Sequence, residues 1–250
     1  MSRSDEFLGA VRSEFPGDRV TFQKGVPAFH PETAEEAAGL FKLANQHQQK
    51  VFISGFGNNI SPTGPAFDEI ITIQSDRLNT LLEVAAQNYY ITVGGGYPLR
   101  EINRQLAPLK LALPHSNLPC VSSVGGAIAV GLSADLHGRD LPLKKYFIKA
   151  EIVTPEGDII KPGSTCFKSV SGYDIIRIFS GSWGVLGMIV SATFRVMPES
   201  GLTELSSMRM KAVSREDFLN GLAQTNTSVD AVYSRKVKDK FDPNGVLPIV

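Results

Sequence analysis

A glycine-rich loop is the first place in this chain where the residue types suit the binding of an anion. The predicted strand at 51–53 runs directly into residues that are mostly small or carry an amide: Ser54, Gly55, Phe56, Gly57, Asn58 and Asn59. Glycine lets main-chain N–H groups approach a phosphate closely and adopt positive φ, and asparagine tolerates the same left-handed region. The loop is therefore a candidate phosphate site, although ordinary surface turns have a similar composition.

A nicotinamide dinucleotide fingerprint is one alternative for this loop. Gly55 and Gly57 follow a strand, and Asp76 lies about 20 residues further on, where a ribose-binding acid is expected. That fingerprint also needs a helix to begin at the second glycine, so that the helix N-terminus faces the pyrophosphate. Pro62 and Pro65 exclude a regular helix here, so the loop must hold its ligand with turn amides alone.

The composition excludes several classes of protein. The chain has 250 residues, 42% of them hydrophobic, and its 25 Lys and Arg balance 25 Asp and Glu, so no net charge favours nucleic acid. The polar residues 1–15 do not resemble a signal peptide, and no run of 18 apolar residues predicts a membrane span, so a cytoplasmic location is expected. Cys120 and Cys166 lack a zinc-binding spacing, and no metal site is predicted.

The elements that position the loop alternate between helices and strands. Thr33 begins a predicted capping box, and apolar residues at helical spacing predict an amphipathic helix over 34–48. Ile175, Ile178 and Phe179 are expected to face the core from a short helix. The other expected elements are strands at 69–74 and 187–197 (the latter half-buried), hairpins at 83–93 and 147–161, helices around 7–11 and after Pro98 and Ser214, and a short helix at 171–179.

A second loop, at residues 119–126, is rich in hydroxyl groups and glycines, and the small residues 127–132 continue it. Such a segment either packs its backbone against a flat ligand or makes a close contact between a helix and a sheet. Glycines also cluster at 55–57, 94–96, 125–126 and 181–187, as a ligand lying along several backbones would require.

Six segments carry a resemblance in the same order as in a known family. Residues 54–59 align with a pyrophosphate loop R-G-G-G-T-S, and 93–103 with G-A-G-x-x-L-x-x-L. Residues 122–129 align with T-I-G-G-x-I-A, 171–175 with T-G-Y-D-L, 181–189 with G-S-E-G-T-L-G-I-I, and 240–245 with a closing K-x-x-F-D-P-x-G. The chain thus resembles the PCMH-type FAD-binding domain of the vanillyl-alcohol oxidase family, and within it the D-2-hydroxyacid dehydrogenases and the smaller flavin subunit of glycolate oxidase.

The resemblance implies an α+β fold of two α/β lobes with FAD between them and with the cap domain largely absent. Residues 1–25 would be an N-terminal lead-in, 26–96 the small lobe, 97–200 the larger lobe, and 201–250 a vestigial cap and C-terminal tail. The amides of 55–59 would hold the pyrophosphate. The segment 121–133 would follow the ribityl chain and one edge of the ring, the strand 150–153 would flank the adenine, and residues 187–189 would close the groove.

The cofactor-binding residues implied by the resemblance lie on both loops and on two strands. They are Ser54, Gly55, Phe56, Gly57, Asn58, Asn59, Pro119, Ser122, Ser123, Gly125, Gly126, Ala129, Ser133, Val153 and Ile189. Asn58 stands where some relatives attach the flavin to a histidine, which predicts non-covalent FAD. Ser54 replaces the loop arginine, so the predicted clamp consists of neutral amides.

The expected function is the oxidation of a small 2-hydroxy acid, such as glycolate or D-lactate, as a subunit that works with another flavin or iron-sulfur subunit. His137 is a candidate base at the ring and Arg139 a candidate carboxylate ligand, although a structural histidine and a solvated arginine would look the same. The alternative is a non-catalytic FAD-binding or assembly module whose open flavin face docks a partner.

Overall fold

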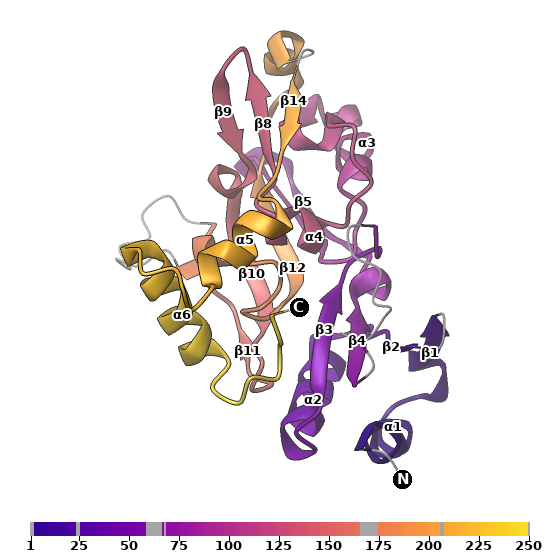
Figure 1. The fold of residues 1–250 in the computed structure, drawn as a ribbon. Helices are drawn as coiled ribbons and strands as arrows, with labels where there is room; N and C mark the ends of the chain where they lie inside the picture. Colours follow the sequence, from indigo (N-terminus) through magenta and orange to yellow (C-terminus); the bar gives the residue numbers. More distant parts are fainter. Residues whose placement is uncertain are drawn as a thin grey trace.

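Two sheet-based lobes make up the fold, and helix α2 (Ala34–Gln46) lies between them (Figure 1). The computed structural model describes residues 3–23, 26–58, 67, 69–165, 175–205 and 208–249. Within these ranges, no helix has the length and apolar character that crossing a membrane requires.

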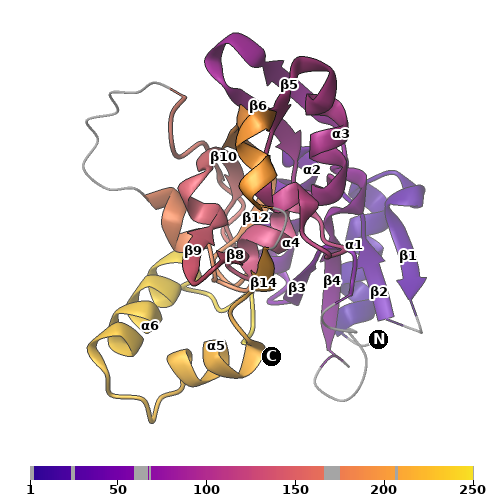
Figure 2. The same ribbon diagram turned by 90° about the horizontal axis from the view of Figure 1, so that it is seen from above.

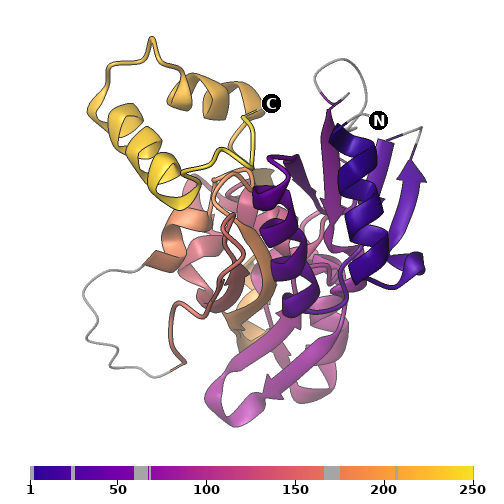
Figure 3. The same ribbon diagram turned by 90° about the horizontal axis from the view of Figure 1, so that it is seen from below.

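The small lobe is built on a four-stranded sheet in the order β1-β2-β4-β3. Strand β1 (Val20–Gln23) is antiparallel to β2 (Val26–Phe29), and β4 (Ile70–Gln74) runs parallel to both β2 and β3 (Lys50–Ser54). Helix α1 (Arg3–Glu14) lies beside α2 on the sheet (Figure 3). The segment expected as a lead-in thus contributes one helix and one strand to this lobe.

The sequence prediction of α2 is confirmed. The Thr33 hydroxyl accepts a hydrogen bond from the Glu36 N–H at 3.1 Å, and the Glu36 carboxylate accepts one from the Glu32 N–H at 2.7 Å. These contacts satisfy main-chain donors before the first helical turn. The apolar face is fully buried against both lobes and consists of Ala37, Leu40, Phe41 and Ala44.

The larger lobe is built on an antiparallel sheet in the order β11-β10-β12-β6-β5. Its strands are β5 (Leu81–Ala85), β6 (Tyr90–Gly94), β10 (Phe147–Val153), β11 (Ile159–Ile160) and β12 (Met188–Arg195). Both expected hairpins are present. Because β5 and β6 join this sheet, the larger lobe begins near Leu81, earlier than the expected boundary at residue 96.

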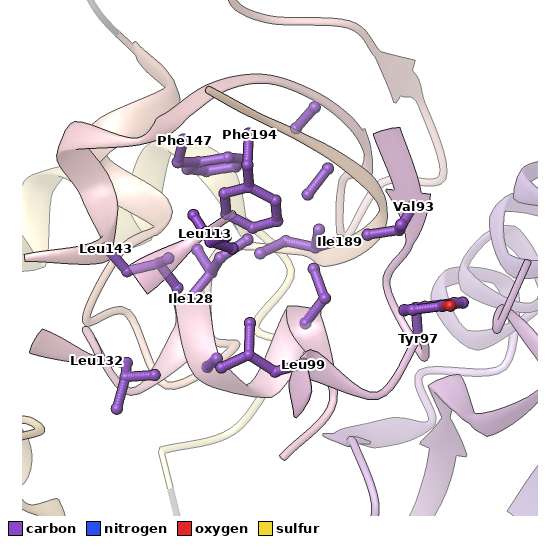
Figure 4. Close-up of a cluster of buried hydrophobic side chains, with 14 of the residues drawn as sticks. Val93, Tyr97, Leu99, Leu113, Ile128, Leu132, Leu143, Phe147, Ile189 and Phe194 are labelled. Atoms are coloured by element: carbon purple, nitrogen blue, oxygen red, sulfur yellow. The ribbon is translucent and has the colours of Figure 1, made fainter. Parts of the chain in front are cut away.

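Helices α3 (Ile102–Leu106) and α4 (Val124–Ala129) belong to the larger lobe, and α4 contacts β12 and β6. The core between these elements is continuous (Figure 4). Its aromatic centre is Phe147 against Phe194, with ring centroids 5.8 Å apart. A short strand pair, β7 (Leu111–Ala112) with β13 (Met197–Pro198), lies at the edge of this lobe.

The prediction that residues 187–197 form a half-buried strand is wrong, because every residue of β12 except Arg195 is buried. The simple alternation also fails, since Ile189 pairs with Ile152 while Ser191 pairs with Glu151, which leaves Val190 as an extra residue. Such a β-bulge reverses the faces on either side of it. Val190 therefore packs in the small-lobe core, on the side of α2, whereas Phe194 packs in the larger-lobe core.

The prediction for the short helix around 175–179 needs a second correction. Residues 166–174 lie outside the described part of the chain, and Ile175–Phe179 form a 3₁₀ helix. Its three-residue period buries Ile176 and Phe179 and leaves Ile175 and Ile178 exposed at 47% and 37%. Phe179 was predicted correctly, whereas the two isoleucines were wrongly placed in the core.

The segment after β13 adds one strand and two α-helices to the larger lobe. Strand β14 (Arg209–Lys211) adds to the hairpin of β8 (Ser133–Leu136) and β9 (Arg139–Pro142). Helices α5 (Arg215–Leu222) and α6 (Val229–Phe241) project from the larger lobe on the side away from β1 and β2 (Figure 2). Ser214 caps α5 as predicted, whereas α6 was not predicted from the sequence.

The tail after α6 returns to the small lobe. The Asp242 carboxylate accepts hydrogen bonds from Lys238 and from the main-chain N–H groups of Val246 and Leu247. The Val51 N–H then donates to the Val246 carbonyl at 2.8 Å, so the tail covers the open edge of β3. Val246 and Leu247 are buried in the core of the small lobe. The tail thus ties α6 to the lobe that carries the glycine-rich loop.

Candidate functional site

The candidate site is a hollow of about 530 Å³ between the end of β3 and the start of α4. In Figure 1 the arrowhead of β3 points toward α4. Both predicted loops contribute to its wall, together with one tryptophan. The described lining residues are Phe52, Ile53, Ser54, Gly55, Phe56, Gly57, Asn58, Val121, Ser122, Ser123, Gly126, Ala129, Val130 and Trp183.

The first loop leaves β3 at the buried Ser54 and turns at Gly57, whose φ of +72° favours glycine. At its end the Asn58 side-chain amide donates to the Val121 carbonyl at 2.8 Å. This bond joins the two loops across the mouth of the hollow. Asn59, which was also predicted to bind the cofactor, lies outside the described residues.

The second loop becomes helix α4 after only a few residues. The Ser123 hydroxyl accepts a hydrogen bond from the Gly126 N–H at 3.1 Å, which fixes the first turn. A Cβ atom at Gly126 would meet the Ser123 and Ser122 hydroxyls, on the side of the hollow. A Cβ atom at Gly125 would instead lie 3.1 Å from the Gly95 carbonyl oxygen. The segment was expected either to pack its backbone against a ligand or to make a close contact between a helix and a sheet. Gly126 faces the site, as the first alternative requires, and Gly125 faces the sheet, as the second requires.

Close approach of the two loops explains why Gly55 carries no side chain. A Cβ atom there would lie 2.5 Å from the Ser123 hydroxyl oxygen. The wall of the hollow is therefore made of backbone and small side chains, and none of its described lining residues is charged. A flavin nucleotide needs hydrogen-bond donors near its phosphates and near the carbonyl and nitrogen acceptors of its ring. Main-chain N–H groups can supply these donors. The described residues therefore fit FAD.

Trp183 is the largest side chain in the wall. Its φ is +51°, a strained conformation for a bulky residue, and its main-chain N–H donates to the Ala129 carbonyl at 2.9 Å. The indole Nε1 is buried and has no hydrogen-bond partner among the described residues. A buried donor without a partner is costly, and an acceptor atom of a bound ligand would satisfy it.

Two further hollows adjoin the first and share Trp183 with it. One, of about 360 Å³, lies between β3 and α5, and the other, of about 1310 Å³, lies between α4 and the segment 210–215. Cys120 lines the larger one, and burial raises the pKa of its thiol. This cysteine is therefore a neutral wall residue near pH 7 and not a reactive thiolate.

Several residues predicted to touch the cofactor lie elsewhere. Pro119 is not among the residues that line the hollow. The Ser133 hydroxyl donates to the Asp140 carboxylate within the β8–β9 hairpin. Val153 and Ile189 are buried in the two cores, where they support the sheet. The structure therefore does not bring these residues, or Gly125, to the wall of the hollow.

His137 and Arg139 lie at the exposed turn of the β8–β9 hairpin. His137 has φ of +48°, and the Asp135 carboxylate accepts a hydrogen bond from the Gly138 N–H at 2.9 Å, which shapes the turn. In Figure 1 this hairpin extends beyond the lobes, at the end opposite α1. Neither residue lines any of the three hollows, so the structure does not place the two candidate catalytic residues at the site.

The predicted cofactor-binding residues do not include five residues of the wall, namely Phe52, Ile53, Val121, Val130 and Trp183. Phe52 and Ile53 were assigned only to a strand, and Val121 and Val130 only to the segment that follows the ribityl chain. A signal for Trp183 was present, because a bulky residue lies between Ser182 and Gly184 in a glycine-rich turn. A large side chain in such a turn is unusual and therefore indicates a candidate functional residue.

The fold and the groove together define a two-lobed cofactor-binding domain. Residues 27–163, more than half of the chain, match the family described as FAD binding domain. The chain belongs to this family. The match confirms the predicted resemblance, the α+β fold class and FAD as the cofactor, whereas the individual binding residues stay predictions.

Similar proteins include FAD-linked oxidoreductases and dehydrogenases. A D-lactate dehydrogenase of Archaeoglobus fulgidus is 28% identical over 234 residues, which cover 88% of this chain and 52% of that protein. The FAD-linked oxidoreductase tazG of Aspergillus terreus is 31% identical over 175 residues, covering 70% and 34%. The glycolate oxidase subunit GlcD of Bacillus subtilis is 27% identical over 171 residues, covering 68% and 36%. The chain thus spans about half or less of the length of these relatives.

A solved structure of alkyldihydroxyacetonephosphate synthase matches with a TM-score of 0.65 and 21% identity, covering 78% of this chain and 40% of that protein. At this identity the likeness concerns the fold alone.

Proposed function

We propose that this chain binds FAD non-covalently between its lobes and takes part in the oxidation of a small 2-hydroxy acid such as glycolate or D-lactate. The observation that carries the proposal is the hollow where the loop at 54–58 faces the loop at 121–126, because its backbone and hydroxyl wall suits a flavin nucleotide. The names of the similar D-lactate dehydrogenase and glycolate oxidase subunit support the substrate class. The two lobes, each carrying one loop, are the proposed domain division.

In this proposal the main-chain amides near Gly55 and Gly57 bind the diphosphate, and the wall at Gly126 and Ala129 positions the flavin. Trp183 donates its indole N–H to an acceptor of the cofactor. FAD supplies the two-electron chemistry when bound. The protein residues contribute by holding the ring in a fixed orientation and by excluding water from one of its faces.

We further propose that the chain acts as a subunit in a complex. Among the described residues that line the three hollows, none carries a carboxylate, an imidazole or an amine that would remove a proton from a hydroxy acid. In the proposal, a redox partner subunit supplies that group and accepts the electrons. The cytoplasmic location stays a prediction.

An alternative is that the chain is an FAD-binding module whose exposed face docks a partner without catalysis. Val121, Met210 and Val213 line the hollow of about 1310 Å³ and are 59%, 47% and 38% exposed. Exposed apolar side chains grouped around a concave surface are typical of interaction sites, so this observation favours a docked partner in either version.

The test begins with the visible spectrum of the purified protein after addition of FAD. We expect a bound flavin that is released completely when the protein is precipitated with acid, as non-covalent binding requires. Anaerobic addition of glycolate or D-lactate should then bleach the flavin, alone or together with co-purified subunits. A protein that takes up no FAD would overturn the proposal, and bound flavin that stays oxidised in the purified complex would favour the docking module.

A further inference from the structure

The charge distribution in the groove contains one feature that the proposed function does not use. Among the described residues that line the three connected hollows, Arg215 is the single charged side chain. It lines both the hollow of about 360 Å³ and the hollow of about 1310 Å³. Arg215 does not line the hollow of about 530 Å³ itself, but it lines the hollow of about 1310 Å³ together with Asn58, Val121 and Ser122 of the two loops.

The position of Arg215 is fixed by contacts to the site wall. The Val213 N–H donates to the Val130 carbonyl at 2.9 Å, which joins the segment before α5 to the end of α4. The Trp183 and Phe218 rings lie 6.2 Å apart between their centroids, which packs α5 against the wall. Arg215 is the first residue of α5, and the Ser214 hydroxyl accepts from the Asp217 N–H at 3.0 Å. Arg215 thus begins a capped helix that is packed against the wall of the groove.

The ligand needs a charge of this kind. The diphosphate of FAD carries two negative charges, and the described part of the loop at 54–58 offers it only neutral groups. A guanidinium donates several N–H groups in a planar arrangement that matches phosphate oxygens, and hydrogen bonds to ionised groups are stronger than those between neutral ones.

We propose that Arg215 supplies the positive charge that holds the diphosphate of FAD in the groove, so that the start of helix α5 completes the phosphate site. The inference rests on the FAD-binding part of the proposed function. It assigns Arg215 to the cofactor and not to the carboxylate of a substrate.

The test compares the dissociation constant of FAD between the wild type and the variants Arg215→Gln and Arg215→Lys, measured by flavin fluorescence. The matched control is Arg209→Gln, which removes an exposed arginine of β14 that lines none of the three hollows. We expect Arg215→Gln to raise the dissociation constant by about 10- to 100-fold, the range for a hydrogen bond to a charged group. Arg215→Lys should raise the dissociation constant of FAD less than Arg215→Gln does, and Arg209→Gln should have the same constant as the wild type.

A second measurement separates the charge from the shape of the groove. The dissociation constant of riboflavin, which lacks phosphate, should be the same for the wild type and Arg215→Gln. In addition, the affinity of the variant for FAD should depend less on the concentration of NaCl, because an ionic contact is lost. Thermal unfolding of each variant checks that it folds.

Three outcomes would overturn the inference. The first is an unchanged FAD dissociation constant in Arg215→Gln, including the case in which only reduction by a hydroxy acid is impaired, which would assign Arg215 to the substrate. The second is an equal loss for FAD and riboflavin. The third is failure of the wild type to bind FAD, which would overturn the proposed function as well, whereas the first two leave that function intact.

Discussion

Two glycine clusters in this molecule have opposite surroundings. At residues 94–96 the chain packs against β12 and the segment after β4, and a Cβ atom at Gly94, Gly95 or Gly96 would lie only 1.8 to 2.0 Å from a carbonyl oxygen of Leu78, Ile189 or Ser75. At Gly57 the nearest atom to such a Cβ is the Ser54 hydroxyl oxygen at 3.9 Å. The glycines at 94–96 are needed because protein fills the space, whereas Gly57 has open space beside the groove, although Gly55 in the same loop meets the Ser123 hydroxyl at 2.5 Å. Glycine content alone therefore does not identify a ligand site.

The largest effect is expected for Gly96→Ala, which tests whether the cluster at 94–96 leaves room for a side chain. The new methyl group would overlap the Ser75 carbonyl, and backbone atoms in both lobes would have to move. We expect the free energy of unfolding to fall by roughly 3 kcal/mol or more, measured by denaturant unfolding. The control is Gly9→Ala in α1, where no atom lies within 4 Å, and the helix should gain up to about 1 kcal/mol. Equal stability of Gly96→Ala and the wild type would contradict the close packing described for residues 94–96.

Helix α4 contains one glycine of each kind, since Gly125 packs against protein and Gly126 lies beside the hollow. Gly125→Ala should cost about 1–3 kcal/mol of stability, because its methyl group would meet the main-chain carbonyl of Gly95 at 3.1 Å. Gly126→Ala should change stability by less than about 1 kcal/mol, because it meets side-chain hydroxyls and alanine favours the helix. Its methyl group takes space in the hollow, however, and we expect roughly tenfold weaker FAD binding.

Both α4 variants are measured by thermal unfolding and by FAD titration. A Gly126→Ala protein that binds FAD as well as the wild type would show that the cofactor does not approach this helix face. A Gly125→Ala protein that is stable yet binds FAD poorly would indicate that Gly125 contacts the cofactor, as the sequence predicts.

The smallest expected effect concerns the packed interior of the larger lobe, where His115 is fully buried and contacts the Leu141 carbonyl at 2.7 Å. Burial lowers the pKa of His115, so its neutral form is preferred in the folded state. Stability should therefore be constant above the unfolded value near 6.5 and fall as the pH drops through that value toward the lowered one, by at most about 1.4 kcal/mol per pH unit.

The measurement is the midpoint of thermal unfolding between pH 7.5 and 5.5, with His115→Phe for comparison. The variant should lose the part of the pH dependence that His115 causes, although the Leu141 carbonyl loses its partner. An identical pH dependence in both proteins would show that His115 does not contribute. The groove, whose described lining contains no histidine, should make no matching contribution.

Local patterns predicted much of this fold. The capping box at Thr33, the turn at 155–158 and the cap at Ser214 each depend on contacts within a few residues, and the elements beside them are present. The errors lie where distant segments decide the outcome. Nothing near Val190 in sequence indicates a bulge, because the bulge arises from the pairing of its neighbours Ile189 and Ser191 with Ile152 and Glu151.

The candidate site shows the same division. The loop at 54–58 and the start of α4 were found from glycines and hydroxyl groups, which are local signals. Val153 and Ile189 were placed at the ligand by the order of motifs, yet their neighbours are core side chains. Arg215 lies near the groove through the packing of α5 against Trp183, which the residues around Arg215 do not reveal.

The docking of the tail on β3 has a consequence for the time at which the small lobe is completed during synthesis. Asn244 donates its side-chain amide to Asn45, a residue 199 positions earlier in the chain, and Val246 occupies the edge of β3. At about 5–20 residues per second, the ribosome needs roughly 10–40 s to deliver the partner of that edge. Until then β3 presents unpaired main-chain groups, and the nascent chain depends on its own charges or on a chaperone to avoid pairing with a neighbour.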